Sequence, residues 1–327
     1  MISGLVLGNT KSGKPLFWEN MENPHAAVTG RSGSGKSYFV KRMVVQAVQQ
    51  GALVLVLDYS GDFCGYDPPE DLPFQCVDVL SPEFRVNPLV GAPTADACAQ
   101  QLLSLLHSVF RMGVRSMAAL LKTARDYLAL DSTPTLAGLR TYATMIEDSG
   151  RGLVAALEPV ELLESLLHPG SEAISLNLSE PGLTVLDLTG LLDPNMVKIV
   201  VELILRCVWN QRTASATPLI LVMDECQSIS WGQSSMAIRI LREGRKFNVA
   251  GWFSTQWLTN KEATAAIGQA ALQAYFRPDD QNVNQLAKKL CQGGSGNICQ
   301  YQRLVSSLRR GQFLWQRSDG RTVIVNV

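Results

Sequence analysis

The chain has 327 residues, of which 46% are hydrophobic and 18% are charged. This balance allows a packed core and excludes an intrinsically disordered chain, and at about 150 residues per domain the length fits one large domain or two modest ones. The formal net charge is zero, which excludes the overall basic surface of a typical nucleic-acid-binding protein.

Short strands and helices alternate along most of the chain. Residues 4–18 indicate a hairpin of two strands, and apolar runs bounded by turns predict further strands. These predicted strands are 26–29, 52–58, 75–80, 183–188, 219–224 and 249–255. Segments with helical spacing, such as 36–50 and 195–211, separate most of them. Strands that alternate with helices predict an α/β fold with a mostly parallel sheet covered on both faces.

Residues 94–167 break this alternation. Amphipathic helices are expected at 100–110, 117–130 and 161–167, with no strand between them. We interpret residues 93–174 as an all-helical insertion in a sheet domain formed by residues 1–92 and 175–327. After Asn260 the pattern predicts a helix, a short strand near Tyr275, two helices around a flexible loop at 292–297, and two closing strands at 311–315 and 322–325.

A phosphate-binding loop follows the predicted strand at 26–29. The sequence matches G-x-x-x-x-G-K-[ST] in full between a strand and a helix, which is the context that this motif requires. Its residues are Gly30, Arg31, Ser32, Gly33, Ser34, Gly35, Lys36 and Ser37. The glycines let backbone N–H groups surround a phosphate. Lys36 would reach the β- and γ-phosphates of ATP, and Ser37 would ligate Mg²⁺.

Two carboxylates end the apolar strand after Met223. Asp224 and Glu225 form a Walker B arrangement, in which Asp224 would hold Mg²⁺ and Glu225 would act on the attacking water. The alternative is a plain strand end that meets solvent. A glutamate here indicates hydrolysis, and it disfavours a small-molecule kinase, for which no acceptor site is recognisable. A GTPase is disfavoured because the sequence has no Asn-Lys-x-Asp motif.

Further polar and basic residues follow these carboxylates. Gln256 should lie at the same sheet edge as Asp224 and sense the bound nucleotide, unless it only closes a strand. Arg242, Arg245 and Lys246 lie on a segment that leads away from the chain's own phosphate loop. Arginine is suited to stabilising a transferring phosphoryl group, often from a neighbouring subunit, whereas a solvated basic helix end is the alternative.

Several segments, in this order and spacing, form a recognisable set. They are the phosphate loop, Asp-Tyr-Ser-Gly-Asp-Phe at 58–63, Val-Asn-Pro-Leu at 86–89, Leu-Asp-Leu at 186–188, Met-Asp-Glu at 223–225, Gly-Arg-Lys at 244–246 and Thr-Gln at 255–256. This set resembles the HerA/FtsK superfamily, and within it the ATPase domain of conjugative-transfer (type IV secretion) ATPases. The resemblance covers residues 4–327.

The resemblance implies a RecA-like P-loop ATPase core assembled as a ring, usually a hexamer, with ATP and Mg²⁺ at subunit boundaries. By position, Arg245 matches the arginine finger that acts on the neighbouring subunit, and Gln256 matches the sensor. Arg309 and Arg310 lie in a segment that could add a second basic contact to the neighbour, and Asp58 and Asp62 receive no role. The secretion ATPases usually carry a large N-terminal docking domain, where this sequence has only about 20 residues.

We therefore expect an ATP-hydrolysing ring motor that moves DNA or powers conjugative DNA transfer or type IV secretion. From Trp231 to the end, 13 Lys and Arg stand against 5 Asp and Glu, and this positive part supports contact with a phosphate backbone. A HerA-like DNA-processing or defence ATPase remains an alternative, as does an assembly or remodelling ATPase that acts on protein.

The expected location is the cytoplasm, with any contact to the inner face of a membrane made through partners. No apolar run approaches the ~18 to 20 residues that cross a bilayer, and the first residues do not resemble a signal peptide. The seven cysteines are odd in number and include no Cys-x-x-Cys pair, which indicates reduced thiols. His25, His107 and His168 lack metal-ligand spacing and are interpreted as structural.

Overall fold

The computed structural model describes residues 4–19, 23–110, 112–146, 151–166, 172–212, 217–258, 260–294, 296–317 and 320–327. The strands are β1 (Leu5–Asn9), β2 (Pro15–Trp18), β3 (Ala26–Thr29), β4 (Leu53–Asp58), β5 (Phe74–Asp78), β6 (Gly182–Asp187), β7 (Leu219–Met223), β8 (Val249–Thr255), β9 (Leu272–Phe276), β10 (Gln312–Gln316) and β11 (Thr322–Asn326). The α-helices are α1 (Lys36–Gln49), α2 (Ala95–Val109), α3 (Val114–Leu130), α4 (Leu136–Ile146), α5 (Arg151–Leu166), α6 (Pro194–Gln211), α7 (Met236–Glu243), α8 (Lys261–Ile267), α9 (Val283–Gly293) and α10 (Ile298–Ser306).

The strands of the described residues form one sheet in the order β2-β1-β11-β10-β9-β3-β8-β7-β4-β6-β5. The seven strands from β9 to β5 run parallel to one another, and β10, β11, β1 and β2 continue the sheet with antiparallel pairs. The mixed α/β architecture with a mostly parallel sheet confirms the predicted RecA-like fold class, including the N-terminal hairpin.

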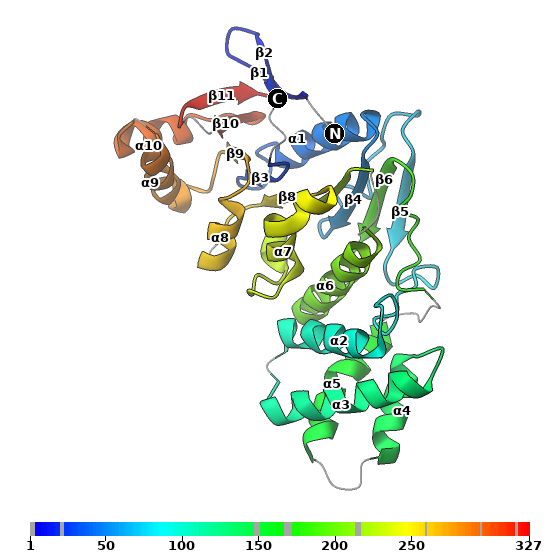
Figure 1. Cartoon of the computed structure of the whole chain (residues 1–327). Helices are drawn as coiled ribbons and strands as arrows, with labels where there is room; N and C mark the ends of the chain where they lie inside the picture. The colour runs from blue at the N-terminus through cyan, green and yellow to red at the C-terminus, as the bar shows by residue number, and fades with distance from the viewer. Residues whose placement is uncertain are drawn as a thin grey trace.

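The central strands are apolar on both sides because both faces of the sheet are covered. Every residue of β4, β7 and β8 is buried. One face packs on α1, and the other packs on α6, α7 and α8, as Figure 1 shows. Continuous apolar runs of this kind are typical of parallel strands inside an α/β sandwich.

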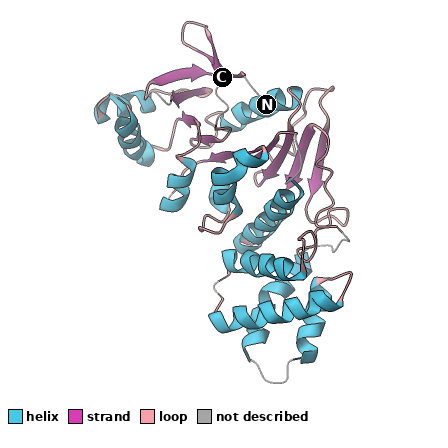
Figure 2. Ribbon diagram, viewed as in Figure 1, coloured by secondary structure: helices cyan, strands magenta, loops and turns pink. Residues whose placement is uncertain are grey.

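Between β5 and β6 the chain forms the helices α2, α3, α4 and α5, which lie together at one end of the molecule (Figures 1 and 2). The contact of α2 with α6 joins them to the sheet layer, and the Asn210 amide donates to Gln101 Oε1 at 3.0 Å. The division of the chain at residues 93 and 174 stays a prediction.

These helices differ from the predicted ones in their bounds. The helix expected from residue 100 begins at Ala95, because the Thr94 hydroxyl caps it by accepting the Ala97 N–H at 3.1 Å. The sequence pattern did not predict α4, whose interior contains Gly138. A Cβ at that position would lie 2.1 Å from the Tyr127 hydroxyl, so the glycine permits close packing of α4 on α3. Leu167 and His168 lie outside the described residues.

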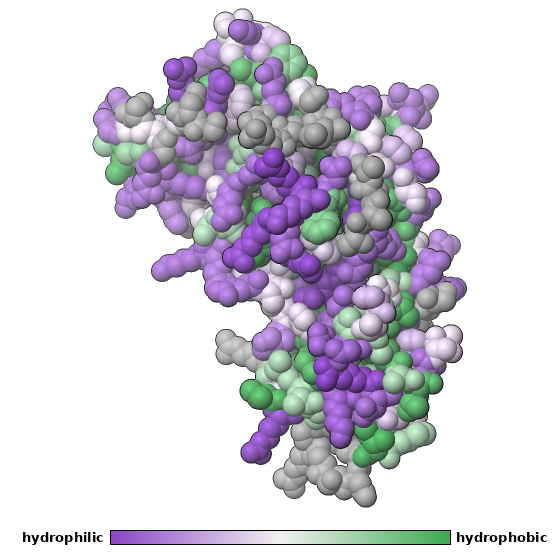
Figure 3. Space-filling model, viewed as in Figure 1, coloured by the Kyte–Doolittle hydropathy of each residue, from purple (hydrophilic) through white to green (hydrophobic). Residues whose placement is uncertain are grey.

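The face seen in Figure 3 is largely polar, and apolar side chains are visible on its helical region. Val114, Leu130 and Met145 there are 84%, 75% and 78% exposed. Among the described residues, no helix combines the length and apolar character needed to cross a membrane.

Candidate nucleotide site

The sheet brings the predicted site residues to one edge. Parallel register places Thr29 of β3 beside Thr255 of β8, and Met223 of β7 beside Phe253 of β8 and Leu57 of β4. The segments that follow β3, β4, β7 and β8 therefore leave the sheet at the same carboxyl edge, where α/β proteins bind ligands. These segments carry the phosphate loop, Asp62, Asp224 with Glu225, and Gln256.

The phosphate loop connects β3 to α1, and backbone hydrogen bonds join it to the ends of neighbouring strands. Gly33 and Gly35 have φ angles of 69° and 105°, which favour glycine. A Cβ on Gly30 would lie 2.5 Å from Phe276 Cβ, so this position has no room for a side chain. The Gly30 N–H donates to the Thr255 carbonyl at 3.2 Å, which ties the loop directly to the end of β8.

Side chains of the loop point toward its own backbone. Lys36 Nζ donates to the Arg31 carbonyl at 3.2 Å, and Ser34 Oγ donates to the same oxygen at 2.7 Å. Lys36 is only 6% exposed, and burial lowers the pKa of its ammonium, while the carboxylates of Glu225, Asp224, Asp62 and Asp279 act in the opposite direction. Ser32 is exposed at the tip of the loop. A buried ammonium beside a glycine-rich loop that opens a helix fits a polyphosphate.

A second loop, residues 58–66, links the two predicted magnesium ligands. Ser37 Oγ donates to Asp62 Oδ2 at 2.8 Å, and Ser60 Oγ donates to Asp224 Oδ2 at 2.7 Å. Asp224 is buried, which raises the pKa of its carboxyl, and the bond from Ser60 partly offsets this effect. Ser37 offers a hydroxyl oxygen and Asp224 offers carboxylate oxygens. Mg²⁺ prefers oxygen ligands of this kind, together with phosphate oxygens and water.

Asp58 organises this loop. Its side chain is fully buried, and its two carboxylate oxygens accept four backbone N–H groups at 2.9 to 3.2 Å, from Ser60, Gly61, Phe63 and Cys64. The sequence assigned no role to Asp58 or to Asp62. The available signal was an acidic residue at a strand end followed by Tyr-Ser-Gly, a composition that favours such a side-chain-to-backbone turn.

Glu225 is held by two glutamine amides. Gln256 Nε2 donates to Glu225 Oε1 at 3.2 Å, and Gln227 Nε2 donates to the other oxygen. Gln227 in turn accepts the Thr255 hydroxyl at 2.7 Å. Glu225 has a φ of 45°, a strained backbone conformation for a side chain of this kind, and such strain clusters at functional sites. The contact between Gln256 and Glu225 joins two residues that the sequence analysis singled out separately, whereas Gln227 was not predicted.

The predicted arginine finger lies at the opposite edge of the sheet. Arg245 and Lys246 belong to the 3₁₀ turn η3 (Gly244–Phe247), which leads into the amino end of β8, and Arg242 lies in the last turn of α7. All three side chains are exposed. Because β8 has seven residues at about 3.3 Å each, roughly 20 Å separate Arg245 from the carboxyl edge of its own sheet.

Arg309 and Arg310 precede Gly311 at the start of the closing strands. The Gly311 N–H donates to the Ser34 carbonyl at 3.0 Å, so these arginines lie beside the phosphate loop of their own chain.

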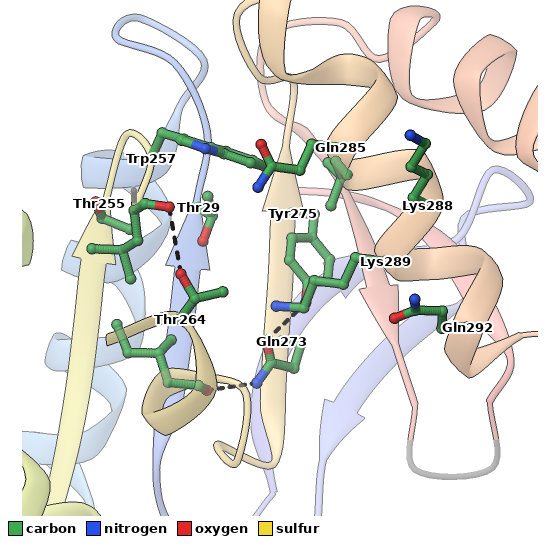
Figure 4. Close-up of a pocket in the computed structure, with 13 residues that line it drawn as sticks. Thr29, Thr255, Trp257, Thr264, Gln273, Tyr275, Gln285, Lys288, Lys289 and Gln292 are labelled. Carbon is green, nitrogen blue, oxygen red and sulfur yellow. Dashed lines mark hydrogen bonds between the residues drawn. The ribbon is translucent and has the colours of Figure 1, made fainter. Parts of the chain in front are cut away.

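A cavity of about 400 Å³ lies next to Gln256, on the sheet face away from α1. Trp257 forms one side of it, and Lys288 and Lys289 of α9 form the other (Figure 4). At its base the Tyr275 hydroxyl donates to Gln273 Oε1 at 2.9 Å.

Comparisons with known proteins agree with this architecture. Residues 4–208 match the family described as "Helicase HerA, central domain". No curated protein matches the sequence. Among solved structures, VirB4 of Thermoanaerobacter pseudethanolicus superposes with a TM-score of 0.79 at 16% identity, covering 99% of this chain and 96% of that one.

The bacterial conjugative coupling protein TrwB is also similar in fold. Its sulphate complex gives a TM-score of 0.69 at 13% identity, over 100% of this chain and 89% of that one. Its complex with ADP and Mg²⁺ gives 0.68 at 14% identity, over 100% and 90%. The family match over residues 4–208, together with the shared fold, shows that the chain belongs to the HerA central-domain family and is a P-loop ATPase of the HerA/FtsK type.

Proposed function

We propose that this protein hydrolyses ATP in a homo-oligomeric ring, and that hydrolysis moves DNA in conjugative transfer or type IV secretion. The observation that carries the proposal is the meeting of Lys36, Ser37, Asp224 and Glu225 at one sheet edge. The conjugative coupling protein that shares this fold has structures with ADP and Mg²⁺ and with an ATP analogue, which supports the same ligands here.

In this proposal each side chain has a distinct task. The Lys36 ammonium and the N–H groups of residues 33–37 bind the phosphates, and Ser37 and Asp224 hold Mg²⁺, which when bound neutralises charge on the β- and γ-phosphates. The Glu225 carboxylate accepts a proton from the attacking water. Each of its two oxygens accepts one glutamine N–H and keeps a further lone pair for the water, and Gln256 is suited to make the orientation of Glu225 depend on the nucleotide.

The position of Arg245 supports the ring. Arg245 lies roughly 20 Å from the sheet edge that carries the phosphate loop of its own chain, so it cannot reach a γ-phosphate bound there. An exposed guanidinium at the far edge can instead face a neighbouring subunit. The ring size, usually six in this superfamily, is part of the proposal. DNA as the track rests on the positive part of the chain from Trp231 to the end and on the likeness to a conjugative coupling protein.

ATP hydrolysis by the purified chain, with and without DNA and beside its mass in solution, tests the proposal. We expect turnover that DNA stimulates, from an assembly larger than a monomer, and a rate ~10² to 10⁴ times lower from Glu225→Gln. Turnover that DNA leaves unchanged would favour an ATPase that acts on protein. A lack of turnover in every assembly state would contradict the proposal.

A further inference from the structure

Two cysteine thiols from separate segments meet beside the proposed nucleotide site. Cys64 lies in the loop 58–66 and Cys76 lies in β5, and their sulfur atoms are 2.8 Å apart. A disulfide requires the two sulfurs to approach to about 2.05 Å. A small movement of either side chain would therefore suffice to join them.

The backbone holds both cysteines in place. The Cys64 N–H donates to Asp58 Oδ2 at 2.9 Å, and the adjacent Phe63 is buried in the core below α1. Cys76 pairs with Val185 of β6 in parallel register, and Val185 is buried in that same core. Since paired residues in a sheet share a face, Cys76 lies on the α1 side of the sheet, where the loop 58–66 also packs.

The two thiols differ in access to solvent. Cys76 is exposed on the edge strand, whereas Cys64 is partly buried. Burial raises the pKa of the Cys64 thiol, and the contact with Cys76 and the charge of Asp58 act in the same direction. Cys76 is therefore the thiol that meets an oxidant first, and Cys64 is positioned to resolve the product.

We propose that Cys64 and Cys76 are a redox modification site that closes to an intramolecular disulfide. With hydrogen peroxide as oxidant, the Cys76 sulfur attacks one peroxide oxygen and forms a sulfenic acid, and the other oxygen leaves as water. The Cys64 sulfur then attacks the sulfenic sulfur, the S–S bond forms, and the hydroxyl leaves with the Cys64 proton as a second water. Two thiols are oxidised by two electrons and one peroxide is reduced.

The disulfide would connect the loop 58–66 to the edge of the sheet. This loop makes the contacts of Asp62 with Ser37 and of Ser60 with Asp224. A loop tied to β5 could not withdraw from these residues when Mg²⁺ and nucleotide enter or leave. Oxidation should therefore slow hydrolysis reversibly, a consequence that rests on the proposed function, whereas the disulfide itself does not.

Mapping of the thiols tests the disulfide. The folded chain is treated with hydrogen peroxide, alkylated with iodoacetamide, digested with a protease that cleaves after Glu70, between the two cysteines, and analysed by mass spectrometry. We expect a linked pair of peptides that joins Cys64 to Cys76, lighter by two hydrogens than the separate peptides and released by dithiothreitol. Cys299, an exposed thiol elsewhere in the chain, is the internal control.

Three variants complete the experiment. Cys64→Ser and Cys76→Ser should each abolish the link, whereas Cys299→Ser should retain it. Alkylation of Cys64 and Cys76 after peroxide to the same extent as before would overturn the proposal. In the wild type and in Cys299→Ser, peroxide should lower ATP turnover several-fold and dithiothreitol should restore it, with no such loss in Cys76→Ser.

The two proposals fail in different ways. If the link forms and turnover is unchanged, the disulfide does not regulate the site and that part is wrong. If the reduced protein shows no turnover, the proposed function is wrong, while the peptide map still shows whether the disulfide forms.

Discussion

Lys36 and Glu225 lie at the same sheet edge, yet their replacement should have different effects. Lys36→Ala should abolish nucleotide binding, because the phosphates lose their fixed cation. Glu225→Gln should bind ATP and hydrolyse it ~10² to 10⁴ times more slowly, since an amide cannot take the proton of the attacking water. Binding of a fluorescent ATP analogue, measured beside phosphate release, distinguishes the two. Normal hydrolysis by Glu225→Gln would remove Glu225 from the catalytic residues.

His25 should make folding stability depend on pH. Its side chain is 3% exposed, and its Nδ1 accepts the Gly251 N–H of β8 at 2.9 Å, which requires the unprotonated nitrogen. Burial lowers the pKa of this histidine to about 4. The stability that neutral His25 contributes is therefore complete above the unfolded pKa of about 6.5 and is lost as the pH falls toward 4. Over this range the free energy of unfolding should fall by roughly 3 kcal/mol.

A comparison with His25→Gln tests this prediction, because a glutamine oxygen can accept the same N–H without titrating. Thermal unfolding between pH 4 and 8 should show a steeper loss of Tm in acid for the wild type than for the variant. Parallel curves for the two proteins would mean that His25 does not titrate on unfolding.

At the level of helices, a buried carboxylate on α6 positions α7, which precedes the proposed arginine finger. Both oxygens of Glu202 accept the Met236 N–H at the start of α7, at 3.0 and 3.1 Å, and Glu202 also forms an ion pair with Arg206 at 2.8 Å. Glu202→Ala leaves the Arg206 charge and this N–H without their partner. We expect it to lower the free energy of unfolding by about 3 kcal/mol.

Glu243→Ala is the matched control, because it breaks the exposed pair of Glu243 with Arg239 on α7 itself. Such a pair contributes about 0 to 1 kcal/mol. Urea unfolding of both variants measures the difference. Equal losses would show that α7 does not depend on the buried contact.

In the proposed ring, Arg245 should act on the neighbouring subunit. Arg245→Ala should bind ATP normally yet fail to hydrolyse it, since loss of an arginine finger typically costs ~10³ to 10⁵ in rate. Mixing the inactive Arg245→Ala and Glu225→Gln proteins creates some boundaries with an intact Arg245 from one subunit and an intact Glu225 from the other. Phosphate release should then partly return. Mixed rings that demonstrably form and stay inactive would place the role of Arg245 within its own subunit.

The strands and most helices could be predicted because their signals are local. The bounds of β3 and β8 agree exactly with the sequence pattern, and α1 and α6 agree within one residue. The prediction missed α4, because Gly138 weakens the helical pattern there. The glycine is explained by the Tyr127 side chain of α3, which leaves no room for a Cβ at position 138. Bounds also moved where a capping side chain such as Thr94 sets the first turn.

The residues of the proposed site could likewise be predicted from short motifs, because the phosphate loop and the Asp-Glu pair at the end of a strand each lie within a few consecutive positions. Contacts between distant segments were not readable, since they depend on how strands are ordered and how loops fold back. The sheet order brings Gln256 to Glu225, Asp62 to Ser37 and Gly311 to Ser34. The same packing places Cys64 against Cys76, because side-chain periodicity identifies a strand but does not specify its neighbour.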